Sequence, residues 1–191
     1  WQHENLSGLT VIEGDALKFD FNQWSQQRSE KSGLCKVVGN LPYNISSPLL
    51  FHLVSAASHI DEQVFMLQAE VVERMVAQAG SSDFSRLSVM LQARYDMELV
   101  LEVPPEAFEP APKVNSAVVR MIPRKEFHLN FAQWSALEQV VAAAFSQRRK
   151  MLRTNLQPFA SKLKLSEDEL KARAQDISVD RYIEWAKLLA N

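Results

Sequence analysis

The sequence predicts an α/β fold, in which a doubly wound, mostly parallel sheet is followed by a small all-helical domain. In the first two thirds of the chain, short apolar runs bounded by turn residues alternate with helical patterns. This alternation is typical of a sheet with connecting helices packed on its faces. Beyond residue 125 the pattern becomes wholly helical. We therefore expect a sheet domain at residues 1–125 and a helical domain at residues 126–191.

The elements of the sheet domain follow from these patterns. Strands are expected at residues 9–13, 35–39, 64–68, 98–103 and 116–122. A partly helical crossover is expected at 16–30, and helices are expected at 46–58, 70–79 and 87–93. The last two strands are joined by a proline-rich loop without a convincing crossover helix, so we expect them to form an antiparallel pair.

The helical domain is predicted from amphipathic spacing. Apolar residues recur every three or four positions at Phe131, Trp134, Leu137, Val141, Ala144 and Phe145. Ser166 and Glu169 have the spacing of a capping box at the start of another helix. A last helix is expected at residues 179–189.

Composition is that of an ordinary globular protein. Of 191 residues, 47% are hydrophobic and 23% are charged. No apolar stretch approaches the ~18 residues that span a bilayer, and no signal-peptide pattern opens the chain. Cys35 is the single cysteine, which excludes an internal disulfide. We expect a cytoplasmic protein that is not associated with membranes.

Charge is unevenly distributed between the two domains. Residues 1–125 carry 11 Lys and Arg against 15 Asp and Glu, whereas residues 126–191 carry 10 against 8. Several positive residues of the second domain lie close together, at Arg148, Arg149, Lys150 and Arg153. A local basic patch of this kind suffices to bind a polyanion whose shape is also recognised. A solvated charged face, or favourable placement at a helix C-terminus, is the alternative.

The tetrapeptide Asn-Leu-Pro-Tyr at residues 40–43 is the most informative motif. It follows an apolar strand and places a carboxamide, a rigid turn and an aromatic ring side by side. The Asn40 side-chain oxygen can accept a hydrogen bond from the N6 amine of adenine, as can a backbone carbonyl left free because Pro42 fixes the turn. Tyr43 offers a ring on which an unstacked base can lie. An ordinary strand-to-helix turn is the alternative interpretation.

The longer string at residues 40–51 resembles the signature of the S-adenosylmethionine-dependent rRNA adenine N6,N6-dimethyltransferases. Segments 65–72, 103–120 and 145–150 resemble later blocks of that family, in the same order. Within the family the resemblance is to the KsgA (RsmA) type, which acts on small-subunit rRNA. Pro48 and the Gln-Arg-Arg-Lys sequence ending at residue 150 favour that type over enzymes that modify large-subunit rRNA.

The resemblance implies a Rossmann-like class I methyltransferase sheet and an S-adenosylmethionine-dependent enzyme of ribosome biogenesis. Its reaction would be dimethylation of N6 on two adjacent adenosines near the 3′ end of 16S rRNA, in the 30S subunit or its precursor. Two alternatives stay open. One is an enzyme that modifies 23S rRNA, and the other is a noncatalytic assembly or RNA-binding factor with the same fold.

The resemblance also implies roles for individual residues. The catalytic pocket would consist of Asn40, Leu41, Pro42, Tyr43 and Phe108. The cofactor would be contacted by Asp15, Ala16 and Asn40, although Asp15 also suits a simple turn and Phe108 also suits a core position. RNA would be bound by Lys113, Arg148, Arg149, Lys150 and Arg153, although Lys113 equally suits a solvated position. No metal site is expected, since His3, His52, His59 and His128 show no paired spacing with acidic residues or cysteine.

The chain begins with Trp1, and no glycine-rich cofactor loop precedes Asn40. We therefore expect an N-terminally truncated enzyme that lacks the first strands of its sheet. Such a fragment would be inactive and would bind S-adenosylmethionine very weakly. The complete protein is expected to be a monomer, while the fragment would associate through an exposed sheet edge.

Overall fold

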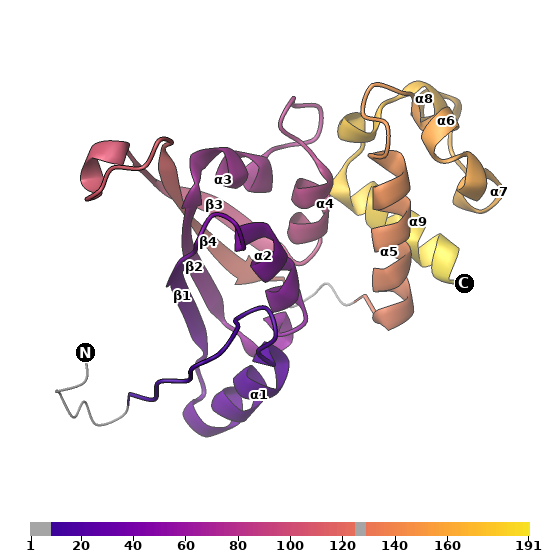
Figure 1. Cartoon of the computed structure of the whole chain (residues 1–191). Coiled ribbons are helices and arrows are strands. Elements are labelled where there is room, and N and C mark those ends of the chain that lie inside the picture. Colours follow the sequence, from indigo (N-terminus) through magenta and orange to yellow (C-terminus); the bar gives the residue numbers. More distant parts are fainter. Residues whose placement is uncertain (1–8, 125–128) are drawn as a thin grey trace.

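The computed structural model describes residues 9–124 and 129–191, and its centre is a four-stranded sheet (Figure 1). The strand order is β1-β2-β4-β3. The strands are β1 (Lys36–Asn40), β2 (Glu62–Gln68), β3 (Tyr95–Val103) and β4 (Ser116–Pro123). β1 and β2 are parallel, whereas β4 runs antiparallel to both β2 and β3. Within the described residues the sheet is therefore mixed rather than mostly parallel.

Short helices connect and cover the strands. In the sheet domain they are α1 (Phe21–Ser32), α2 (Ser46–Val54), η1 (Ala57–His59), α3 (Ala69–Val76), α4 (Arg86–Gln92) and η2 (Pro105–Ala107). The helical unit comprises α5 (Phe131–Ala144), α6 (Leu152–Asn155), η3 (Gln157–Phe159), α7 (Ala160–Leu163), α8 (Glu167–Lys171), η4 (Ala174–Asp176) and α9 (Val179–Ala190). No described helix is long and apolar enough to cross a membrane.

One face of the sheet builds the first core. Phe65 and Leu67 of β2 are buried there together with Leu50 of α2 and Val72 of α3. The opposite face carries Val38, which is 76% exposed. In Figure 1, α2 and α4 lie to the right of the strands and α1 lies to the lower right, while no labelled helix lies on their left side.

A row of charged side chains crosses this open face. Lys36 of β1 lies 2.6 Å from Glu62 of β2, and Arg120 of β4 pairs with both Glu62 and Glu98 of β3. The hydrogen bond from Lys36, followed by that from Arg120, lowers the pKa of Glu62 below its usual value. Lys36, Arg120 and Glu98 keep much of their surface in water, whereas Glu62 is 18% exposed, so the solvated partners limit the stability that each pair adds.

The helical unit has a second core. Leu137 of α5 and Tyr182, Trp185 and Ala186 of α9 are fully buried in it. Phe84, just before α4, belongs to the same cluster, so the sheet domain contributes to this core as well. The domain boundary near residue 125 stays a prediction.

The strand expected at residues 9–13 is wrong, because the structure gives these residues no strand pairing. A strand is stable only when a neighbour satisfies its backbone groups. Among the described strands, β1 pairs with β2 alone and forms an edge. Leu9, Val11 and Ile12 are instead exposed, at 63%, 84% and 56%.

Most other elements are confirmed with shifted ends. The helix expected at 46–58 ends at Val54, and the strand expected at 98–103 begins earlier, at Tyr95. β3 and β4 form the expected antiparallel pair. The capping box is present, because the Ser166 hydroxyl accepts from the Glu169 N–H and the Glu169 carboxylate accepts from the Ser166 N–H.

A buried polar contact links the sheet to α2. The Tyr95 hydroxyl donates to the Leu53 carbonyl at 3.2 Å and accepts from the Gln63 amide at 3.0 Å. Burial raises the pKa of Tyr95 well above its usual value. The hydroxyl therefore stays neutral and keeps its donating proton.

Replacing Tyr95 with Phe should lower the free energy of unfolding by about 1–3 kcal/mol, because the buried Gln63 amide would lose its acceptor. The Leu53 carbonyl would still accept from the Ala56 N–H. Urea denaturation of the two proteins measures this difference. Tyr43→Phe is the matched control, because it removes one hydroxyl contact, to the Ser116 Oγ, from a side chain that is 36% exposed, and it should cost less. Equal losses in the two variants would contradict the role of the buried contact.

Candidate functional site

The Asn-Leu-Pro-Tyr motif lies where β1 ends. The Leu41 N–H donates to the Met66 carbonyl at 3.1 Å, which continues the β1–β2 pairing one residue past the strand. The chain then turns at Pro42, whose carbonyl accepts from the Ile45 N–H at 3.1 Å. This turn leads directly into α2 and leaves the Asn40 and Tyr43 side chains near the surface.

Gly39 lets the motif pack closely against β2. A Cβ atom at this position would lie 3.0 Å from a side-chain carbon of Leu41 and 3.5 Å from Phe65. Leu41 itself is buried, with 8% of its surface exposed. Leu41 therefore anchors the motif in the core, while its neighbours stay available to a ligand.

The motif and Phe108 line one hollow of about 310 Å³. Its lining consists of Asn40, Leu41, Pro42, Tyr43, Phe108, Pro110 and Pro112. The structure thus brings together all five residues expected in the catalytic pocket. The lining combines aromatic and proline rings with one carboxamide, which suits a flat base that carries polar groups at its edge.

Ser116, a residue that the sequence did not single out, holds Tyr43 in place. The Tyr43 hydroxyl and the Ser116 Oγ lie 2.9 Å apart, and Ser116 is 1% exposed at the start of β4. This contact fixes the Tyr43 ring at the mouth of the hollow. A serine at the start of a strand carries no specific sequence signal, so only the fold reveals its partner.

The second wall comes from the loop between β3 and β4. The Phe108 N–H donates to the Pro105 carbonyl at 3.1 Å, and Phe108 is half-buried. At the end of the loop, the Asn115 carbonyl accepts from the Ala69 N–H at 2.9 Å. Lys113 lies on the same loop and is exposed, so an extended ligand in the hollow can reach it.

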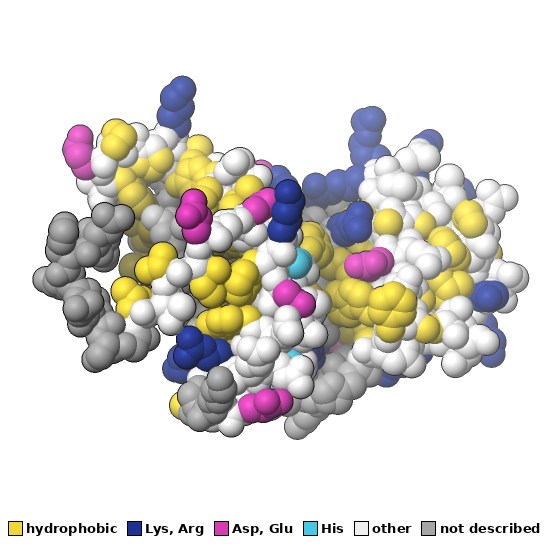
Figure 2. All heavy atoms as spheres, turned by 60° about the horizontal axis from the view of Figure 1, so that its bottom comes forward, with side chains coloured by type: hydrophobic (Ala, Val, Ile, Leu, Met, Phe, Trp, Pro, Cys, Tyr) yellow, Lys and Arg dark blue, Asp and Glu magenta, His cyan; other side chains and the backbone are white. Residues whose placement is uncertain are grey.

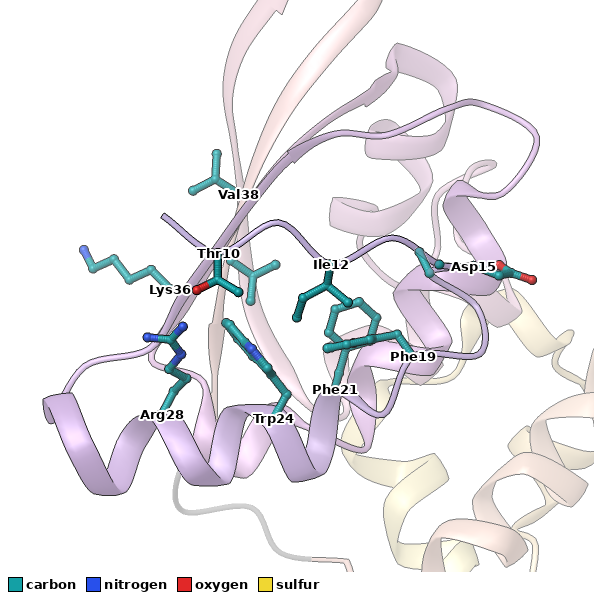
Figure 3. A pocket seen from close by; sticks show the side chains of 12 residues that line it. Thr10, Ile12, Asp15, Phe19, Phe21, Trp24, Arg28, Lys36 and Val38 are labelled. Carbon is teal, nitrogen blue, oxygen red and sulfur yellow. The ribbon is translucent and has the colours of Figure 1, made fainter. Parts of the chain in front are cut away.

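Asp15 and Ala16 line a different hollow, between the segment around Ile12, α1 and β1 (Figure 3). The Asp15 carboxylate accepts from the Leu17 N–H at 3.0 Å. In Figure 3 it points away from the aromatic side chains of Phe21 and Trp24. The three residues expected to bind cofactor, Asp15, Ala16 and Asn40, therefore do not converge on one hollow. The described residues do not fit S-adenosylmethionine as a complete pocket.

The basic residues lie on the turn after α5 and on α6. We call residues 146–150 the basic turn; its Arg148, Arg149 and Lys150 are exposed, as is Arg153 of α6. Arg149, Lys150 and Arg153 have no carboxylate partner among residues 9–124 and 129–191. Arg148 donates to the Ser82 carbonyl of the sheet domain. In Figure 2, Lys and Arg side chains gather along the upper edge of the right-hand lobe.

The described histidines do not form a metal site. His52 Nε2 lies 2.7 Å from the Phe19 carbonyl, which holds the start of α1 against α2. No group of three His, Cys, Asp or Glu in the described part of the chain has the geometry to hold a metal ion. His3 and His128 lie outside the described residues.

The chain matches known proteins along nearly its whole length. A family model described as "Ribosomal RNA adenine dimethylase" matches residues 2–191. The ribosomal RNA small subunit methyltransferase A of Bordetella pertussis is 55% identical over 183 residues, which are 95% of this chain and 66% of the relative. Its counterpart from Burkholderia mallei is 52% identical over 185 residues, 96% of this chain and again 66% of the relative.

Two solved structures share the fold. A dimethyladenosine transferase from Plasmodium falciparum superposes with a TM-score of 0.74 at 25% identity, covering 92% of this chain and 70% of that one. The 23S rRNA methyltransferase ErmE gives a TM-score of 0.62 at 21% identity, covering 95% and 72%. The expected methyltransferase fold is thereby confirmed.

The chain spans about 66% of the length of the relatives that it matches. The family model, by contrast, accounts for all but its first residue. Together with the hollow at residues 40–43, this match identifies the chain as a member of the ribosomal RNA adenine dimethylase family.

Proposed function

We propose that the protein, in its complete form, is an S-adenosylmethionine-dependent enzyme that dimethylates N6 of two adjacent adenosines near the 3′ end of 16S rRNA. The observation that carries this proposal is the hollow in which Asn40, Tyr43 and Phe108 meet. Two aromatic rings and one carboxamide are the groups that bind an unstacked adenine by its faces and its amine.

The residues of the hollow can promote methylation by orientation. The Asn40 side-chain oxygen, together with a backbone carbonyl of the turn at residues 40–43 that keeps a free lone pair, would accept the N6 hydrogens and turn the nitrogen lone pair toward the methyl donor. The same oxygens would stabilise the positive charge that develops on N6. No general base is needed before the methyl group moves, since a proton can leave to water afterwards.

The methyl donor of the proposal is S-adenosylmethionine. Asp15 has the chemistry to accept from the adenine amine of this cofactor, and the Asn40 backbone has the chemistry to contact its methionine end. Because these residues line separate hollows, we attribute to them contacts at two ends of the cofactor and no complete binding site.

The proposed partner is 16S rRNA in the 30S subunit or its precursor, in the cytoplasm where ribosomes assemble. Exposed cations at Lys113, Arg149, Lys150 and Arg153 support contacts to phosphates, and Arg148 belongs to the same basic cluster. Such contacts supply affinity and register, while the hollow selects the base. The complete enzyme would act as a monomer. The open edge of β1, where Val38 is 76% exposed, would favour association of the 191-residue chain.

Two alternatives remain to be separated by experiment. The likeness to a 23S rRNA methyltransferase concerns the fold alone, while the closely similar relatives are named as small-subunit enzymes. Methyl incorporation by the complete enzyme into 30S and 50S particles tests the proposal. We expect labelling of 30S particles; labelling of 50S particles would indicate a 23S enzyme, and labelling of neither would indicate a noncatalytic factor.

In the complete enzyme, Tyr43→Ala should lower the methylation rate about 5- to 150-fold, since base stacking contributes ~1–3 kcal/mol. RNA affinity should change much less, because the base stacks mainly in the reacting complex. Tyr43→Phe and Ser116→Ala are the matched controls: both keep the ring and remove only the contact at 2.9 Å. An affinity loss as large as the rate loss would rule out the stacking role.

Replacing Arg148, Arg149 and Lys150 together with Ala should weaken binding to 30S particles and flatten its salt dependence. Each lost phosphate contact reduces the slope of log affinity against log salt by up to about one unit. The fold should survive, because exposed substitutions usually cost within about 0.5 kcal/mol. An unchanged slope would show that the basic turn faces solvent in the complex.

The 191-residue chain should bind S-adenosylmethionine with a dissociation constant of about 1 mM or weaker, because Asp15 and Asn40 line separate hollows. Calorimetric titration of this chain measures the affinity, with the complete enzyme as the positive control. Micromolar binding by the chain would show that its own residues suffice for a cofactor pocket.

A further inference from the structure

Arg148 differs from the other cations of the basic turn because it contacts the sheet domain. Its guanidinium donates through Nη2 to the Ser82 carbonyl. Ser82 lies in the connection between α3 and α4, residues 77–85, which we call the α3–α4 loop. The contact therefore joins the basic turn to a segment 66 positions earlier in the chain.

Two further contacts hold the α3–α4 loop against the helical unit. The Gly80 N–H donates to the Gln175 carbonyl at 2.7 Å, and Gly80 has a φ of 91°, which favours glycine. Phe84 is fully buried in the helical core, with its ring centroid 6.4 Å from that of Phe145. The loop thus packs against the helical unit, and Arg148 adds a hydrogen bond from the basic turn to it.

A buried asparagine fixes the same turn from the inside. Asn155 of α6 donates through Nδ2 to the Ala144 carbonyl at 2.6 Å and to the Gln147 carbonyl at 3.1 Å. Only 8% of Asn155 is exposed. Carbonyl groups at the C-terminus of a helix lack intrahelical partners, so this amide satisfies groups that the end of α5 leaves open.

We propose that Arg148 and Asn155 are positioning residues, which hold the basic turn at a fixed place relative to the α3–α4 loop and the sheet. In this arrangement Arg149, Lys150 and Arg153 contact phosphates directly, whereas Arg148 acts through the loop. The proposal rests on the RNA-binding role proposed above. The four cations therefore have two roles: Arg148 binds the protein's own backbone, and the other three bind RNA phosphates.

The physical benefit of the arrangement is preorganisation. A turn that is already ordered loses less conformational freedom when RNA binds, so more of each phosphate contact appears as affinity. Because the α3–α4 loop follows α3, which begins directly after β2, the turn is also tied to the strand beside the motif at residues 40–43. The separation between the base hollow and the phosphate contacts is thereby set by the protein.

Hydrogen exchange of the chain without RNA tests the positioning role independently of RNA binding. In Arg148→Ala, amides of the α3–α4 loop should exchange roughly two- to tenfold faster, while those of α9 stay unchanged. Gly80 and Ser81 report this change, since their N–H groups donate to Gln175 and Gln78. Arg149→Ala is the matched control and should leave the loop unchanged. Unchanged exchange in Arg148→Ala, or equal acceleration in the control, would overturn the proposal.

Asn155 has its own matched control on the same helix. Asn155→Ala should speed exchange of the Lys150 amide, which donates to the Gln147 carbonyl at 2.9 Å. Thr154→Ala, at an exposed neighbour, should not. If Asn155→Ala also accelerates α9, the variant has lost global stability, and Arg148→Ala alone then decides the proposal. Normal exchange at Lys150 in Asn155→Ala would overturn the role of Asn155.

Binding to a 3′ fragment of 16S rRNA at several salt concentrations completes the test. Arg148→Ala should weaken binding severalfold with an unchanged salt slope, whereas Arg149→Ala should reduce the slope by up to about one unit. A reduced salt slope in Arg148→Ala would show that Arg148 contacts a phosphate directly. Unchanged RNA affinity in this variant would show that Arg148 has no effect on binding. Either result overturns the proposal. If Arg149→Ala changes neither the RNA affinity nor the salt slope, the proposed RNA-binding role of the basic turn is wrong. The hydrogen-exchange experiment then still tests whether Arg148 holds the α3–α4 loop.

Discussion

The pairing of β2 with both of its neighbours is the interaction on which the rest of the structure depends. On one side, its register places Met66 beside Asn40, and on the other side Gln68 pairs with Ser116. Both neighbours therefore present their functional ends at the same end of β2. Without this pairing, Tyr43 and Ser116, which are 73 positions apart in sequence, would not meet.

The same strand connects the sheet to the helical unit. β2 continues directly into α3, whose end leads through the α3–α4 loop to the buried Phe84. A base hollow and a set of phosphate contacts must keep a fixed separation if both are to engage one RNA. A continuous path of packed elements provides such a separation, whereas a flexible linker between independent domains does not.

Features that depend on residues close together in the sequence were predicted correctly, whereas contacts between residues far apart in the sequence were missed. The motif at residues 40–43, the antiparallel end of the sheet and the capping box at Ser166 depend on neighbouring residues, and each is present. Ser116 was missed because its role comes from a partner brought close by strand pairing. The contact of Arg148 with a backbone carbonyl was missed because any residue at position 82 could supply that carbonyl.

The strand expected at residues 9–13 failed for a physical reason. Residues 9–13 have the composition of a strand, yet composition does not supply the neighbour that a strand requires. Asp15 has suitable chemistry for an adenine amine, but its placement depends on how that same segment packs. Asp15 and Asn40 line separate hollows, and the cofactor contacts assigned to them stay predictions.

The row of charges on the open face of the sheet restricts what can cover that face. Near the functional end the face is apolar, with Val38, Met66, Val118 and Leu101, whereas Lys36, Glu62, Arg120 and Glu98 cross its other end. An element laid over the apolar end gains from removing hydrocarbon from water. Over the charged end it must provide hydrogen bonds in place of the displaced water, or the desolvation of Glu62 and Arg120 opposes its binding. The difference between the two ends determines the direction in which a covering segment binds. The free-energy cost of dehydrating the charged side chains therefore selects that direction, in addition to the shape of the face.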